Sequence, residues 1–138
     1  MYTSDSGLKR HLLCHLAGTV FLALFGAVYE VFSHGVYSYF MIYAFALPLI
    51  LGVALYTELL RRNRFPDRVF LNLWNAGVAA LSAGSVLQGV LEIYGTSNSL
   101  IVVYPAVGGA LLILALLHAL RQHTAVRKAS AHCAESKD

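Results

Sequence analysis

The stretch "GAVYEVFSHGVYSYFM", residues 26–41, separates the first two apolar runs of the chain and decides how its first hairpin is built. It interrupts hydrophobic sequence with a carboxylate, Glu30, and an imidazole, His34, four residues apart. The short Ser-His-Gly segment at 33–35 has the composition of a turn. We therefore predict that the chain reverses direction at residues 33–35 and that ionisable groups gather there.

The composition indicates a membrane protein. The chain has 138 residues, of which 58% are hydrophobic and only 12% charged. A soluble domain of this size needs more charge to cover its surface. Both cysteines, Cys14 and Cys133, fall on segments that we assign to the cytoplasmic side, so we expect no disulfide framework.

Four apolar runs are each long enough to cross a bilayer, which takes about 20 helical residues. They cover about 12–32, 36–60, 69–94 and 100–120. The predicted fold is an all-α integral membrane bundle of four transmembrane helices in two short hairpins, with a kink at Pro48. We assign residues 1–124 to this domain and predict that residues 125–138 form a disordered cytoplasmic tail.

The distribution of positive charge predicts the orientation. All ten Lys and Arg residues fall on the N-terminus, the 61–68 connection or the C-terminal tail. Cytoplasmic segments are enriched in such residues. We therefore expect a protein of the cell membrane, inner or plasma, with both termini in the cytoplasm. The opposite, outer side then carries Glu30, His34 and Glu92.

These three residues form the candidate outer site. Glu30 and His34 share a helical face if the first helix continues that far, and Glu92 ends the third helix at a matching depth. Together they could bind a divalent cation, collect protons or hold a cationic substrate. The alternative is that they are hydrated groups at helix ends that only support the topology.

Other polar residues lie deeper in the predicted helices. Gln88 and Asn75 are expected in the interior of the bundle, where they would hydrogen-bond between helices, as Asn72 also could. His15 and His118 should lie at similar depth near the cytoplasmic surface, where facing helices could ligate a metal or haem. The chain has no CxxCH motif, and we predict no cofactor.

No motif indicates an enzyme, because phosphate-binding glycine loops, GxSxG, HExxH and paired CxxC motifs are missing from the sequence. The basic connection 61–68 is too short for nucleic-acid recognition. We expect a small multi-pass protein that passes or senses a small cationic species through a homo-oligomer. The alternatives are a non-catalytic subunit or assembly partner of a larger membrane complex, and a haem- or quinone-linked redox protein.

Overall fold

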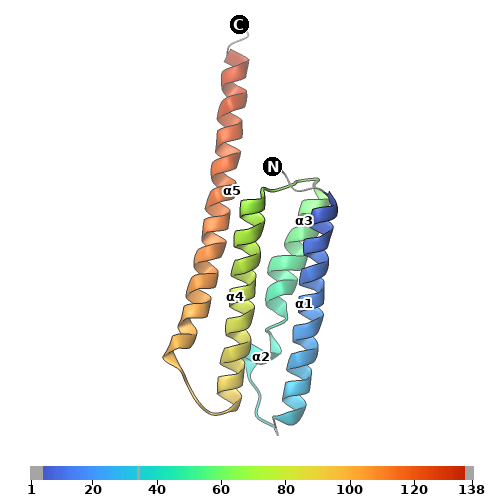
Figure 1. Cartoon of the computed structure of the whole chain (residues 1–138), viewed down its shortest axis with the longest axis vertical. Coiled ribbons are helices and arrows are strands. Elements are labelled where there is room, and N and C mark those ends of the chain that lie inside the picture. The colour runs from blue at the N-terminus through green and yellow to red at the C-terminus, as the bar shows by residue number, and fades with distance from the viewer. Residues whose placement is uncertain (1–4, 34, 136–138) are drawn as a thin grey trace.

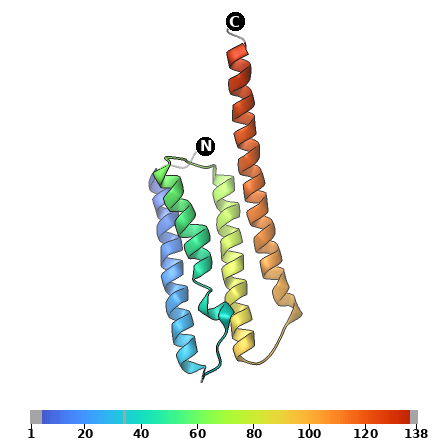
Figure 2. The same cartoon turned by 180° about the vertical axis from the view of Figure 1, so that it is seen from behind.

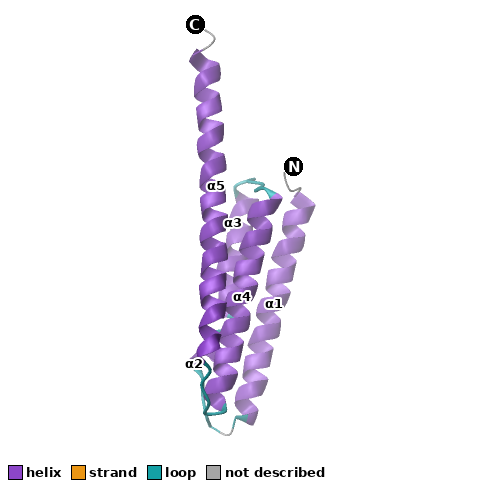
Figure 3. Cartoon of the chain, turned by 60° about the vertical axis from the view of Figure 1, so that its left-hand side comes forward, coloured by secondary structure: helices purple, strands orange, loops and turns teal. Residues whose placement is uncertain are grey.

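The computed structural model describes residues 5–33 and 35–135, and every element in this part of the chain is a helix (Figure 3). Short connections join the helices. In chain order the elements are α1 (Asp5–Phe32), α2 (Tyr39–Ile42), the π-helix η1 (Pro48–Ala54), α3 (Leu55–Arg61), α4 (Arg68–Ile93), the 3-10 helix η2 (Ser99–Val102) and α5 (Val103–Glu135).

Three helical segments are long and apolar enough to cross a membrane. They are α1, α4 and the segment Ser99–Gln122, which joins η2 to the first part of α5. An all-helical fold of the described residues, with helices long and apolar enough to cross a membrane, is therefore confirmed. The predicted count of four spans is not, because residues 36–60 do not form one helix.

The second predicted span breaks near its start. Ser38 is extended, α2 has only four residues, and residues 43–45 form a turn before the helix resumes. Pro48 has no N–H to donate to the carbonyl four residues earlier, and its ring crowds that carbonyl. The wider π-helical turns of η1 begin at this proline. The predicted kink is thus replaced by a break and a change of helix type.

The chain runs back and forth along its long axis (Figures 1 and 2). We call one end, formed by the start of α1, the 62–67 connection and the far part of α5, the basic end. The other, formed by the 35–38 and 94–98 connections, is the acidic end. Gly35 and Gly95 make its turns with φ of +89° and +68°, a backbone conformation that favours glycine.

The helices are arranged in a row, with α1 and α5 on opposite sides of α4 and of the segment from α2 to α3 (Figures 1 and 2). α5 packs along α4 at a contact made close by glycine. A Cβ added at Gly77 would lie 3.0 Å from the carbonyl oxygen of Gly108, and the reverse substitution gives the same distance. Small residues of this kind let helix backbones approach in membranes.

α5 continues as a helix to Glu135 and projects beyond the other helices at the basic end (Figure 1). This course differs from the disordered tail predicted for residues 125–138, of which 136–138 lie outside the described residues. The segment contains four alanines and no glycine or proline, so it can extend an existing helix.

Candidate functional site

Glu30 lies in the last turn of α1 at the acidic end. Its Oε1 atom is buried and has no hydrogen-bond partner among the described residues. A buried carboxylate oxygen without a partner is unfavourable by about 1–3 kcal/mol or more. Binding a proton or a cation there would remove this cost.

Glu92, in the last turns of α4, is exposed and accepts two hydrogen bonds. The Ser38 hydroxyl donates to Oε2 at 2.6 Å, and the Gln88 amide donates to Oε1 at 3.2 Å. Ser38 is 1% exposed and precedes α2, yet its hydroxyl does not cap that helix. Glu92 therefore holds the start of α2 against α4.

α2 lies between the two helices that carry the acidic residues. A Cβ at Gly26 of α1 would lie 3.1 Å from the Met41 carbonyl oxygen, and one at Gly89 of α4 would lie 2.9 Å from Met41 Cβ. Glu30 and Glu92 each follow one of these glycines by about one helical turn. The two carboxylates thus flank α2 at similar depth, although no contact found in the described residues joins them. His34 lies outside the described residues.

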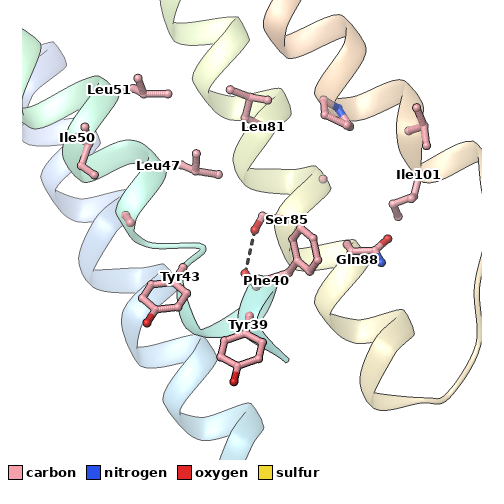
Figure 4. A pocket seen from close by; sticks show the side chains of 14 residues that line it. Tyr39, Phe40, Tyr43, Leu47, Ile50, Leu51, Leu81, Ser85, Gln88 and Ile101 are labelled. Atoms are coloured by element: carbon pink, nitrogen blue, oxygen red, sulfur yellow. Dashed lines mark hydrogen bonds between the residues drawn. The ribbon is translucent and has the colours of Figure 1, made fainter. Parts of the chain in front are cut away.

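A groove with a cavity volume of about 750 Å³ opens beside this acidic end (Figure 4). One wall comes from α2 and η1, the other from η2 and the start of α5, and α4 lies between them. Apolar side chains form nearly all of its lining. The residues are Tyr39, Phe40, Tyr43, Ala46, Leu47, Ile50, Leu51, Leu81, Gly84, Ser85, Gln88, Ile101, Val102 and Pro105.

A second polar cluster lies toward the basic end and is centred on Asn75 of α4. Its Oδ1 accepts from the Tyr56 hydroxyl at 2.6 Å and from His15 Nε2 at 2.8 Å, while its Nδ2 donates to His11 Nδ1 at 3.1 Å. Tyr56 is fully buried and stacks on both imidazole rings, with ring centroids 5.2 and 5.8 Å away. This cluster joins α1, α3 and α4.

The amide sets the protonation of this cluster. It offers an acceptor to one histidine ring and a donor to the other, so at least one ring must be neutral to accept. The opposite amide orientation would exchange the two rings but keep this requirement. Gly52 of η1 makes room for the His15 ring, because a Cβ at this position would overlap His15 Nδ1.

His118 belongs to a separate cluster at the start of α4. Its Nε2 lies 3.4 Å from Asp67 Oδ2, and the Gln122 amide lies 3.1 Å from the same ring nitrogen. Burial alone would raise the pKa of the Asp67 carboxyl, but hydrogen bonds from the Arg68 backbone N–H and His118 hold that pKa below its usual value.

The two histidines weighed as metal or haem ligands are therefore held in different clusters. His15 is bonded to Asn75, and His118 faces Asp67. Among the described residues, no three His, Cys, Asp or Glu side chains lie together as a metal site.

Sequence reasoning missed three parts of these sites. Tyr56 and Ser38 were not singled out, although each carries a hydroxyl in a largely apolar segment, where burial requires a hydrogen-bond partner. The groove was missed because an unbroken helix over 36–60 would have filled it. Pro48, where only a kink was predicted, was the available signal for the break that precedes it.

Comparison with protein-family models, with curated proteins and with solved structures finds no match to this chain.

Proposed function

We propose that this chain is a small multi-pass membrane protein that binds a small cationic species at its acidic end and passes or senses it. In this proposal both termini face the cytoplasm and the acidic end faces outward. The observation that carries it is the buried, unpartnered Oε1 of Glu30. A proton, a cation or another hydrogen-bond donor would satisfy such an oxygen, and of these a proton or a cation also neutralises the charge of the carboxylate.

The charge distribution supports a cation over an anion. Glu30 and Glu92 lie at the acidic end, whereas the Lys and Arg residues of the described part lie on segments of the basic end (Figure 1). The Ser38 and Gln88 donors leave the two carboxylate oxygens of Glu92 with further acceptor capacity. An incoming cation would thus meet two carboxylates and no competing basic side chain in the described residues.

A flux assay in proteoliposomes tests this function. Uptake of protons, alkali cations, divalent cations and small ammonium ions is compared between the wild-type protein and the variants Glu30→Gln and Glu92→Gln. We expect at least one cation whose flux falls tenfold or more in both variants. The matched control is Glu58→Gln, whose carboxylate pairs with Arg61 and Arg62 at the basic end. If both acidic-end variants behave like this control for every cation, the proposal is wrong.

We also propose that the protein works as an oligomer. The long helices and the broken segment between α1 and α4 lie in a row, which leaves little room for an aqueous path within one copy, so a path would form between copies. Native mass measurement and cross-linking in nanodiscs should give a dimer or larger species. A protein that stays monomeric while flux persists would refute this part.

A second candidate function is that of a non-catalytic subunit or assembly partner of a larger complex. It is favoured by α5, which packs on α4 and η2 and projects past the other helices at the basic end (Figure 2). Such a subunit should co-purify from native membranes with a larger partner. Removing residues 125–138 should then release the partner without changing the fold of residues 5–122.

A further inference from the structure

We propose that the groove between the α2–η1 segment and the start of α5 binds the alkyl chain of an amphipathic organic cation, with its charged group beside Glu92. This inference rests on the proposed recognition of a cation at the acidic end. It adds the chemical class of the ligand, an ammonium-type head on an apolar tail.

The size and lining of the groove suit an apolar chain. Its cavity of about 750 Å³ lies within the range of about 300–1,000 Å³ typical of small-molecule sites. From Gln88 to Leu81 the groove follows α4 for about 10 Å, at 1.5 Å per residue. Ile50 on one wall is 63% exposed and Val102 on the other is 63% exposed, so the groove is open at the surface and a ligand can enter from the lipid.

The polar end of the groove adjoins a carboxylate. Gln88 lies at the end of the groove near the acidic end, and its amide donates to Glu92 Oε1 (Figure 4). Glu92 is exposed and sits one helical turn further along α4. A molecule lying in the groove with a head group past Gln88 would therefore place that group beside a negative charge.

Aromatic side chains reinforce the preference for a cation. Tyr39, Phe40 and Tyr43 line the groove at the same end as Gln88 (Figure 4). Aromatic faces attract organic cations electrostatically, by about 0.5–1 kcal/mol at exposed sites and more when water is excluded. An inorganic cation would use the carboxylates but would gain nothing from the apolar part of the groove.

Two hydrogen bonds keep the groove open. Ser38 donates to Glu92, and the Ser85 hydroxyl donates to the Phe40 carbonyl oxygen at 2.8 Å, drawn as a dashed line in Figure 4. Both fasten α2 to α4 and therefore oppose a movement of α2 toward α5. Lipid tails can also enter an apolar groove. The groove and the bilayer interior are similarly apolar, so a tail has no hydrophobic reason to prefer either. Selection therefore falls to the head group, and Glu92 disfavours anionic heads.

Equilibrium binding to the full chain in nanodiscs of zwitterionic lipid tests the inference. The probes are octyltrimethylammonium, tetramethylammonium and octyl sulfate, each corrected for uptake by empty nanodiscs. We expect octyltrimethylammonium to bind with a Kd at least tenfold below that of tetramethylammonium, and octyl sulfate to show no saturable binding. Glu92→Gln should raise the Kd of both cations tenfold or more.

Variants that fill the groove test the contribution of the alkyl chain to affinity separately from that of the charged head group. Ala46→Phe should raise the Kd of octyltrimethylammonium at least tenfold and leave that of tetramethylammonium within twofold. Ile50→Trp, at a more exposed position of the same wall, serves the same purpose if the first variant does not fold. The matched control is Ala17→Phe, which adds the same bulk to an exposed position of α1 outside the groove.

The outcomes distinguish the two proposals. If tetramethylammonium binding depends on Glu30 and Glu92 but the octyl chain adds no affinity, or groove filling has no effect, this inference is overturned while the proposed function stands. Saturable binding of octyl sulfate at a similar Kd would also overturn it. If neither cation binds, this inference is overturned, and the flux assay with protons and inorganic cations then decides the proposed function separately.

Discussion

Replacing Asn75 by leucine, which has a similar size and no polar atoms, should destabilise the protein by about 3 kcal/mol. The amide makes three hydrogen bonds, to His11, His15 and Tyr56. Hydrogen bonds between membrane helices average about 0.6 kcal/mol, so their loss accounts for about 2 kcal/mol. The Tyr56 hydroxyl is fully buried and would lose its partner, which adds about 1 kcal/mol or more.

The assay is reversible unfolding of the purified protein in mixed micelles, with the free energy of unfolding compared between variants. Asn72→Leu is the matched control, because Asn72 lies on the same helix but is exposed. It should change the free energy of unfolding by less than about 0.5 kcal/mol. An Asn75→Leu protein that unfolds within about 0.5 kcal/mol of this control would refute the role given to the cluster.

A double-mutant cycle gives a sharper test of the same reasoning. Tyr56→Phe removes only the hydroxyl, and in the wild-type background it should cost about 1 kcal/mol. In the Asn75→Leu background the hydroxyl has already lost its partner, so the same change should cost nothing or stabilise. Equal costs in the two backgrounds would show that the two side chains are not coupled.

Three further predictions follow from other contacts. Gly52→Ala should cost about 1–3 kcal/mol of unfolding free energy, because its Cβ would meet the His15 ring, whereas Gly109→Ala, with nothing within 4 Å, should be neutral or stabilising. Trp74→Phe removes the hydrogen bond of 2.7 Å that the indole donates to the Leu51 carbonyl in η1, so hydrogen exchange in η1 should speed up while exchange in α5 stays unchanged. The lowered pKa of Asp67 stabilises the folded state above the usual carboxyl pKa of about 4, and this contribution is lost as pH falls through the lower folded value. Asp67→Asn should therefore flatten the acid side of the stability–pH curve, and an unchanged curve would contradict this assignment.

The sequence alone determined the apolar segments and the places of the ionisable groups. The predicted spans 12–32 and 69–94 agree within one residue with the last residues of α1 and α4 and with the start of α4, although α1 begins seven residues earlier than predicted, at Asp5. These ends depend on local features such as a capping aspartate and the end of an apolar run. The segregation of Glu30 and Glu92 from the basic residues could also be read directly, since it follows from the order of the apolar runs.

Only the tertiary structure decided which polar groups meet. His15 and Asn75 are 60 residues apart in the chain, and Ser38 and Glu92 are 54 apart, so no local pattern pairs them. Hydrophobicity cannot tell which helix face packs when lipid is as apolar as the protein interior. Pro48 favours a break locally, but the distant contacts of α2 with α4 decide where α2 lies and therefore that a groove opens beside α5.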